Sequence, residues 1–256
     1  MGDWNAKQYL RFSKERTLPA TDLVHRIELT KPKHILDIGC GPGNSTSELK
    51  KRWPKAQVIG IDSSLDMITT ASASYPDMEF KLVDAAKDLS TITDRYDIVF
   101  SNACLQWIPD HPRIFSEMMD LLNDGGVLAI QIPVNFSEPI HKVIQQVVHK
   151  DKWAELLQYN RELDFLSEEE YHDLLAQVTS DFSMWKTIYM HRMPSYDAIM
   201  DWYRQTGLRP YLQRLSEENQ AKLEAEVLAG IKDEYPLQKN GEIIFRFPRL
   251  FMLGCK

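Results

Sequence analysis

The chain has 256 residues, enough for one large α/β domain or for one domain with a sizeable cap. Its net charge of −7 disfavours nucleic acid as the main partner, because phosphate binding requires a basic surface. No apolar run approaches the ~18 residues of a bilayer-spanning helix, and the charged residues near the start are unlike a signal peptide or an anchor, so no membrane attachment is expected.

The three cysteines, Cys40, Cys104 and Cys255, lie far apart and lack the spacing of metal ligands. Free thiols and a cytoplasmic location are therefore expected. The histidines show no zinc spacing either, so the sequence predicts no metal site. A monomer or a weak homo-oligomer is expected.

Short apolar runs alternate with amphipathic segments in the first half of the chain. The runs are continuous rather than alternating, which is typical of strands buried on both faces. They predict strands at 34–39, 57–62, 78–84, 96–103 and 126–133. Helical patterns lie between them, at 44–53, 65–74 and 112–122. This alternation indicates an α/β fold with a doubly wound, mostly parallel sheet.

After residue 133 the pattern becomes mainly helical, with a β-like run at 184–193 and a last strand at 242–254. Pro248 in that last strand suits an edge or a bulge better than a central, fully paired position. We expect a helical lid at 1–30 and a ligand-binding core at 31–136. A helical cap over the carboxyl ends of the strands is predicted at 137–235, and a C-terminal sheet strand at 236–256.

The stretch "HILDIGCGPGNS" (34–45) places a glycine-rich turn directly after the first predicted strand, where doubly wound sheets bind nucleotide-like ligands. A dinucleotide favours G-x-G-x-x-G, whereas Gly39, Gly41 and Gly43 give G-x-G-x-G. Asp37 directs a negative charge toward the place where two phosphates would lie. This disfavours a pyrophosphate and favours a cation. S-adenosylmethionine carries a sulfonium and an ammonium and no phosphate.

Two further aspartates end the second and third predicted strands. Asp62 is placed to accept hydrogen bonds from both ribose hydroxyls, and Asp84 to accept one from the adenine amino group. Either acid alone is equally typical of a turn or a helix cap. Together with Asp37 and the glycines, they indicate a site along the carboxyl ends of three strands.

The motif "LDIGCGPG" and the strand-end acids resemble the class I S-adenosylmethionine-dependent methyltransferases over residues 34–133. The resemblance implies a Rossmann-like seven-stranded sheet whose last strand is antiparallel. It also implies which residues bind the cofactor: Asp37, Gly39, Gly41, Asn44 and Asn102 for the methionine portion, Asp62, Ser63 and Met67 for ribose and adenosine, and Asp84 and Ala85 for adenine.

Segments outside this core, including "WYRQTGLRPYLQRL" and "YPLQKNGEIIFRFPRLF", resemble the branch of this superfamily that esterifies trans-aconitate, a small tricarboxylic acid. The resemblance implies a polycarboxylate acceptor. Arginine suits carboxylates because its planar fork makes paired hydrogen bonds. We expect acceptor contacts from Arg209 first, then Arg16, then Arg249. The aromatic candidates for a closing lid are Trp4, Tyr9, Trp202 and Tyr235.

Methyl transfer to a carboxylate needs no general base, because the acceptor is already ionised at neutral pH. Gln106 and Trp107 of "LQWIP" are expected at the transfer face with Tyr9, as positioning residues only. The neutral donors would hold the attacking carboxylate, while the arginines bind the others.

Four alternatives remain open from the residues alone. One is a methyltransferase for another small carboxylic acid or for a carrier-bound malonyl group. The second methylates a neutral metabolite, and the third is a NAD-dependent oxidoreductase. The fourth is a binding protein that kept the pocket without catalysis.

Overall fold

The computed structural model describes residues 12–158, 166–204 and 206–256. Its centre is a seven-stranded sheet in the order β3-β2-β1-β4-β5-β7-β6. The strands are β1 (His34–Ile38), β2 (Gln57–Asp62), β3 (Glu79–Leu82), β4 (Tyr96–Asn102), β5 (Leu122–Pro133), β6 (Phe182–Met193) and β7 (Ile243–Cys255). β1 to β5 pair in parallel, whereas β7 is antiparallel to both of its neighbours. The predicted Rossmann-like sheet with an antiparallel last strand is confirmed.

The central strands are mainly apolar because both faces of the sheet are covered. Successive residues point to opposite faces, so Ile35 belongs to one hydrophobic cluster and Leu36 to the other. Helices α2 (Ser13–Arg26) and α3 (Asn44–Arg52) pack together and contribute to the first cluster.

The second cluster is covered by α6 (His111–Asp120) and α9 (Glu168–Val178), which contact each other. Three further elements lie near the β3 edge, namely α4 (Leu65–Ser74), α5 (Ala85–Asp88) and η2 (Leu89–Thr91).

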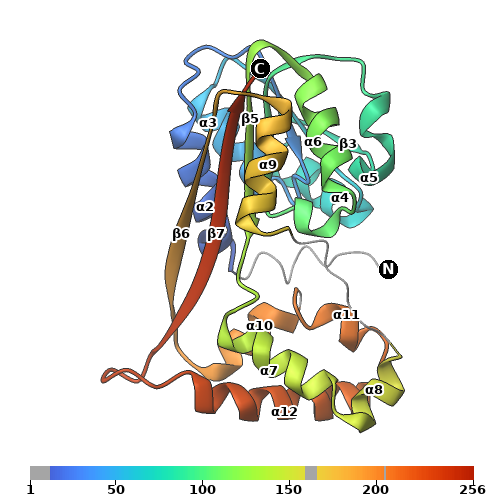
Figure 1. Cartoon of the computed structure of the whole chain (residues 1–256), viewed down its shortest axis with the longest axis vertical. Helices are drawn as coiled ribbons and strands as arrows, with labels where there is room; N and C mark the ends of the chain where they lie inside the picture. Colours follow the sequence, from blue (N-terminus) through green and yellow to red (C-terminus); the bar gives the residue numbers. More distant parts are fainter. Residues whose placement is uncertain (1–11, 159–165, 205) are drawn as a thin grey trace.

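A group of five helices lies beyond the carboxyl ends of the parallel strands, and we call it the cap (Figure 1). It comprises α7 (Pro139–Val148), α8 (Asp151–Leu157), α10 (Tyr196–Arg204), α11 (Arg209–Leu212) and α12 (Glu217–Glu234). In the sequence, α7 and α8 come between β5 and α9, and α10, α11 and α12 come between β6 and β7. Side chains of the cap and of the first sheet face form one continuous hydrophobic cluster, so the cap shares the core of the sheet.

The four predicted segments remain a prediction, but their helices can be placed. α2, from the predicted lid, packs against α3 on a sheet face, and α9, from the predicted cap, packs against α6. No helix in the described ranges has the length and apolar character needed to cross a membrane.

The expected edge or bulge at Pro248 is wrong, because β7 lies inside the sheet and pairs with β6 without a register break. The position is nevertheless not fully paired, as expected, since it has no ladder partner on β5. The pairing of β5 with β7 ends at Pro133 and Arg249, and Arg249 is the residue that follows Pro248. The carbonyl of Pro248 accepts a hydrogen bond from the Val134 backbone N–H at 3.1 Å. In an antiparallel strand the N–H and the C=O of one residue point to the same neighbouring strand. The N–H that proline lacks would therefore face β5 just beyond its last paired residue, so no ladder hydrogen bond is lost.

Candidate active site

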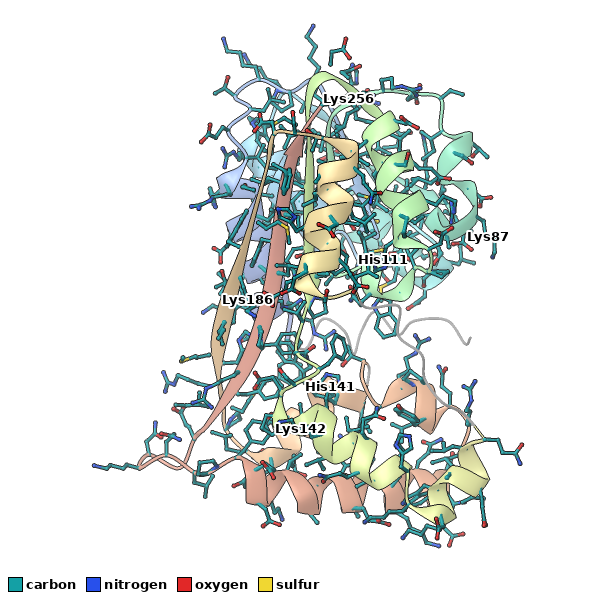
Figure 2. The ribbon with its side chains drawn as sticks, in the orientation of Figure 1. Lys87, His111, His141, Lys142, Lys186 and Lys256 are labelled. Carbon is teal, nitrogen blue, oxygen red and sulfur yellow. The ribbon has the colours of Figure 1, made fainter. Side chains whose placement is uncertain are left out.

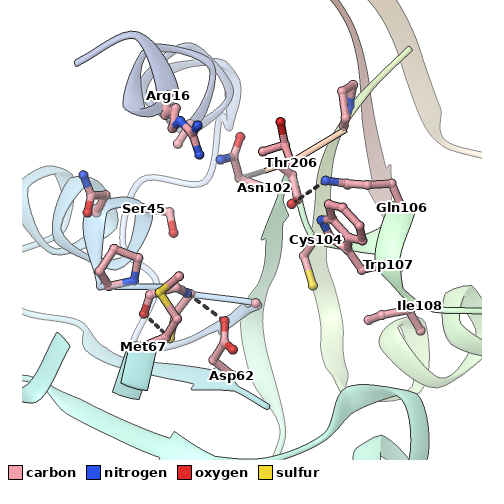
Figure 3. Close-up of a pocket in the computed structure, with 18 of the residues that line it drawn as sticks. Arg16, Ser45, Asp62, Met67, Asn102, Cys104, Gln106, Trp107, Ile108 and Thr206 are labelled. Carbon is pink, nitrogen blue, oxygen red and sulfur yellow. Dashed lines mark hydrogen bonds between the residues drawn. The ribbon is translucent and has the colours of Figure 1, made fainter. Parts of the chain in front are cut away.

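A cavity opens between the carboxyl ends of the parallel strands and the cap (Figure 3). Its walls come from the glycine turn and the strand ends, from α2, and from the cap. Asp62 and Met67 lie on one side of it, and Gln106, Trp107 and Cys104 on another. The site therefore joins residues from nearly the whole length of the described chain.

The glycine turn has the backbone conformation that only glycine adopts easily. Gly39, Gly41 and Gly43 have φ values of 73°, 53° and 91°. A β-carbon on Gly39 would in addition collide with the side chain of Cys104. Gly39 and Gly41 line the cavity, so the backbone itself forms part of the wall.

Asp62, at the end of β2, is held by two backbone donors. One carboxylate oxygen accepts from the N–H of Gly41 at 2.9 Å, and the other accepts from the N–H of Ser64 at 2.9 Å. Asp62 lines the cavity together with Ser63 and Met67. The contacts with ribose and adenosine that the sequence analysis expects of these three residues stay predictions.

Asp84 and Ala85 also line the cavity, after β3. The Asp84 carboxylate caps α5 by accepting from the Ala86 N–H at 3.1 Å, and it accepts from the Lys87 ammonium at 2.7 Å. The hydrogen bond from Lys87 is the main reason why the pKa of Asp84 is lowered. Asp84 is thus both a helix cap and a cavity residue.

Asp37 is completely buried behind the glycine turn and does not line the cavity. One of its oxygens accepts from the hydroxyls of Ser45 at 2.6 Å and Thr46 at 2.7 Å, while the other has no hydrogen-bond partner among the described residues. Burial raises the pKa of Asp37 to about 6 against these two hydrogen bonds. Its influence on the cavity runs through Ser45, which does line it.

Asn44, the first residue of α3, also lines the cavity. Its amide donates to the hydroxyl of Thr17 on α2 at 3.1 Å. This contact fixes α2 beside the glycine turn.

The loop after β4 carries two side-chain oxygens that are buried and have no partner in the described residues. They are Oδ1 of Asn102, at the end of β4, and Oε1 of Gln106. Gln106 belongs to η3 (Leu105–Trp107), and its amide nitrogen donates to the Ala103 carbonyl at 2.7 Å. The sequence led us to expect Gln106 as a donor to a carboxylate, whereas this bond leaves its acceptor oxygen available. Trp107 lines the same wall, as predicted.

Two buried arginines, Arg16 and Arg249, line the cavity. Arg16 lies 5.0 Å from the Trp202 ring, and it donates to the Trp202 carbonyl at 3.4 Å. Arg249 lies 4.3 Å from the Phe247 ring and donates to Oε1 of Gln131 at 3.3 Å. Aromatic rings therefore keep both guanidinium groups in place.

Two other predicted acceptor contacts, Arg209 and Tyr235, do not line the cavity that the described residues form. Both are buried within the cap. The Tyr235 hydroxyl accepts from the Ile140 N–H at 3.2 Å, which joins α12 to the start of α7. Trp4 and Tyr9 lie outside the described residues. Trp202 does line the cavity, as predicted.

Several cavity residues escaped the sequence reasoning, among them Asn135, His141, Tyr203, Thr206 and Phe247. Most lie on or beside the cap, whose position no local motif reveals; Figure 2 shows His141 on the cap and His111 in the sheet body. Tyr203 directly follows Trp202, which the sequence analysis did expect at the site, and this was the indication in the sequence that Tyr203 lies nearby. No three histidine, cysteine, aspartate or glutamate side chains converge as a metal site within the described chain.

Comparison with known proteins gives one family and several structural neighbours. The pattern of a family described as a methyltransferase domain matches residues 35–126. A trans-aconitate 2-methyltransferase from Escherichia coli is 42% identical over 254 residues, which cover 99% of this chain and 98% of that enzyme.

Two solved structures share the fold at low identity. The YcgJ protein of Bacillus is 17% identical, with a TM-score of 0.58, over 93% of this chain and 98% of that one. An O-methyltransferase from Brevibacillus brevis, solved with S-adenosyl-L-homocysteine, is 15% identical, with a TM-score of 0.53, over 97% of this chain and 74% of that one.

Proposed function

Because the chain belongs to the trans-aconitate 2-methyltransferase family, we propose that it esterifies one carboxylate of trans-aconitate, with S-adenosylmethionine as the methyl donor. The products are the monomethyl ester and S-adenosylhomocysteine. The observation that carries this proposal is the pair of buried arginines, Arg16 and Arg249, in the same cavity as the glycine turn and the strand-end acids. Two buried cations suit a small molecule with several carboxylates.

The residues of the strand ends fit S-adenosylmethionine. Asp62 presents a carboxylate beside the glycine turn, and Asn102 and Gln106 present buried oxygens that have no donor among the described residues. Unsatisfied acceptors are costly unless a donor or a cation reaches them, and the cofactor carries an ammonium and a sulfonium. Asp62 would hold the ribose, Met67 and Asp84 would flank the adenosine, and Asn102 would accept from the ammonium.

When bound, S-adenosylmethionine supplies a methyl group on sulfur: a carboxylate oxygen forms the new O–C bond as the S–C bond breaks and its electron pair goes to sulfur. No proton moves, so the chain needs no general base. Its residues contribute by alignment and by exclusion of water. Good orientation alone is worth ~7–11 kcal/mol. Trp107, Trp202 and Phe247 supply the apolar wall that keeps water away from the attacking oxygen.

Arg16 and Arg249 bind the carboxylates that are not methylated. A guanidinium on the attacking oxygen would stabilise its negative charge in the ground state and so raise the barrier. The attacking carboxylate is therefore held by neutral groups.

We also propose that the enzyme acts in the cytoplasm as a monomer or weak homo-oligomer without nucleic acid, which its net charge of −7 and its free cysteines support.

The proposal is tested by incubating the protein with labelled S-adenosylmethionine and a panel of di- and tricarboxylic acids, and by identifying the ester by mass. We expect trans-aconitate to be the preferred acceptor. Calorimetry should detect binding of S-adenosylhomocysteine but not of NAD. A malonyl carrier protein is added to the panel as the alternative acceptor. Equal labelling of the whole panel, or labelling of the carrier protein alone, would contradict the proposed acceptor.

A further inference from the structure

Tyr203 and Asn135 form a buried polar pair on the cap side of the cavity. Tyr203 lies on α10, and Asn135 lies in the segment between β5 and α7. Both side chains line the cavity, although their exposed fractions are only 2% and 4%. They join the cap to the end of a central strand, directly at the site.

The direction of their hydrogen bond fixes the role of the tyrosine hydroxyl. The amide nitrogen of Asn135 donates to the hydroxyl oxygen of Tyr203 at 2.8 Å. The hydroxyl oxygen is therefore an acceptor toward Asn135, and its own proton points elsewhere. No described residue accepts that proton. A buried donor without an acceptor on a cavity wall indicates that a ligand supplies one.

The same hydroxyl stays neutral at physiological pH. Burial raises the pKa of Tyr203 well above its usual value, and the charge of nearby Arg249 opposes this rise only in part. Tyr203 is thus a neutral donor in the same region of the cavity as a fixed cation. A polycarboxylate in this region would find a charged donor for one carboxylate and a neutral donor for another.

The two kinds of donor affect a nucleophilic carboxylate differently. A guanidinium pair binds tightly and withdraws negative charge from both oxygens. A single phenol hydroxyl binds one oxygen and leaves the second oxygen free to attack. Gln106 is less suited to this part, because one of its two amide N–H groups already donates to the Ala103 carbonyl.

We propose that Tyr203, held by Asn135, donates a hydrogen bond to the carboxylate that receives the methyl group and so selects which carboxylate of the acceptor is esterified. This rests on the proposed function of the enzyme. Tyr203 is then a residue that touches the substrate, and Asn135 is a positioning residue that acts through it.

The test compares Tyr203→Phe with Tyr211→Phe in the full-length protein. Tyr211 is a matched control because it lies on the cap, is equally buried, and accepts from the amide of Gln145 at 3.1 Å, but does not line the cavity. A reacting group displaced by about 1 Å loses roughly 100-fold in rate, because its orientation toward the methyl group is lost. We expect a loss of that size in kcat with trans-aconitate for Tyr203→Phe and less than about 2-fold for Tyr211→Phe.

Binding measurements separate this role from general damage. Calorimetry should show that Tyr203→Phe keeps the affinity for S-adenosylhomocysteine and binds trans-aconitate within about 3-fold of the unmodified enzyme, since the arginines remain. The product should contain a larger fraction of esters at the other carboxylates. An unchanged kcat with an unchanged ester pattern would overturn the inference. Absence of any methylation by the unmodified enzyme would instead overturn the proposed function.

The role of Asn135 is tested by a double-mutant cycle. Asn135→Leu keeps the approximate size and removes the donor to Tyr203. If Asn135 acts only through Tyr203, the double variant loses no more activity than Tyr203→Phe alone. Additive losses in the cycle would show that Asn135 acts on its own and would overturn its assignment as a positioning residue.

Discussion

The Asp37 carboxyl group is fully buried, and its ionisation lowers the stability of the folded protein by an amount that depends on pH. Its folded-state pKa of about 6 lies above the ordinary value of 3.8, so the folded state binds the proton more tightly than the unfolded state. The contribution of this group to stability is therefore complete below about pH 4 and is lost as the pH rises toward 6. Above that, the charged form costs roughly 3 kcal/mol at most.

Asp37→Asn removes this cost. The ligand-free variant should gain stability over the unmodified protein, and the gain should be roughly 1 kcal/mol larger at pH 7.5 than at pH 5. Urea unfolding at both pH values measures the difference. The amide can no longer offer an anionic oxygen near the cofactor, so affinity for S-adenosylhomocysteine should fall. If the gain in unfolding free energy were the same at both pH values, it would not come from removal of the buried carboxylate charge.

Arg249 and Arg246 offer a matched comparison on β7. They lie on opposite faces of the strand, as their spacing in a regular strand predicts, and only Arg249 is buried at the cavity. Arg249→Met should raise KM for trans-aconitate roughly 10- to 100-fold, because a charged hydrogen bond to the acceptor is lost. Arg246→Met should leave KM unchanged. Steady-state kinetics measures KM for both substrates in each variant. An equal rise in KM for S-adenosylmethionine in Arg249→Met would contradict the prediction.

At the residue scale, the sequence predicted the cavity residues at the strand ends better than those at the cap. Asp62, Ser63 and Met67 follow one strand end closely, so local spacing determines where they lie. Arg209 and Tyr235 had the right chemistry, but their helices turn these side chains into the cap core. The direction of these two side chains depends on packing between segments that are distant in the sequence, and a single sequence does not reveal such packing.

At the scale of elements, η3 is held from behind by a buried chain of hydrogen bonds. The His111 ring, at the start of α6, bonds to the Leu105 carbonyl at 2.9 Å and to the Tyr171 hydroxyl of α9 at 2.9 Å. The ring donates to the carbonyl, so its other nitrogen accepts from the tyrosine. Helix α9 thereby supports the loop that carries Gln106 and Trp107.

Tyr171→Phe removes one bond of this chain. We expect a loss of about 1 kcal/mol in unfolding free energy and a several-fold lower kcat, because the transfer loop loses support. Tyr196→Phe is the control: its hydroxyl donates to the Tyr235 carbonyl at 2.7 Å within the cap. It should lower stability similarly and leave kcat unchanged. If both variants kept full activity, the loop would need no support from α9.

Strands β1, β2, β4 and β5 were predictable because burial on both faces leaves a nearly continuous apolar run. All seven predicted strands occur, with ends that differ by a few residues. Pro248 misled the prediction because its meaning depends on where the neighbouring strand stops, which is not a local property.

At the scale of the whole molecule, the cap and the sheet share one hydrophobic cluster, so they should unfold together. Gly230 of α12 tests this, because a β-carbon there would lie 2.6 Å from Cγ1 of the buried Val143 on α7. Gly230→Val should destabilise the protein by about 1–3 kcal/mol through overpacking. Calorimetry should show a single transition at a lower temperature.

Ala225→Val serves as the control for that experiment, since it adds the same side chain on the exposed face of α12. It should shift the transition only slightly. Two separate transitions, with only one moved by Gly230→Val, would mean that the cap is an independent unit.

The overall architecture followed from sequence because strand–helix alternation leaves few possible topologies. The cavity did not, because Arg16, Tyr203 and Arg249 lie on three segments that meet only in the folded chain.

The position of β7 has a consequence for how the protein is made. β6 is joined to the sheet only through β7, and β7 also delivers Arg249. During synthesis the five parallel strands emerge from the ribosome more than a hundred residues before β7 does. Until then, β5 exposes an unpaired edge, and nascent chains with such edges are prone to aggregate. A chaperone that shields this edge should bind ribosome-bound chains that stop before β7 and release them once β7 has emerged.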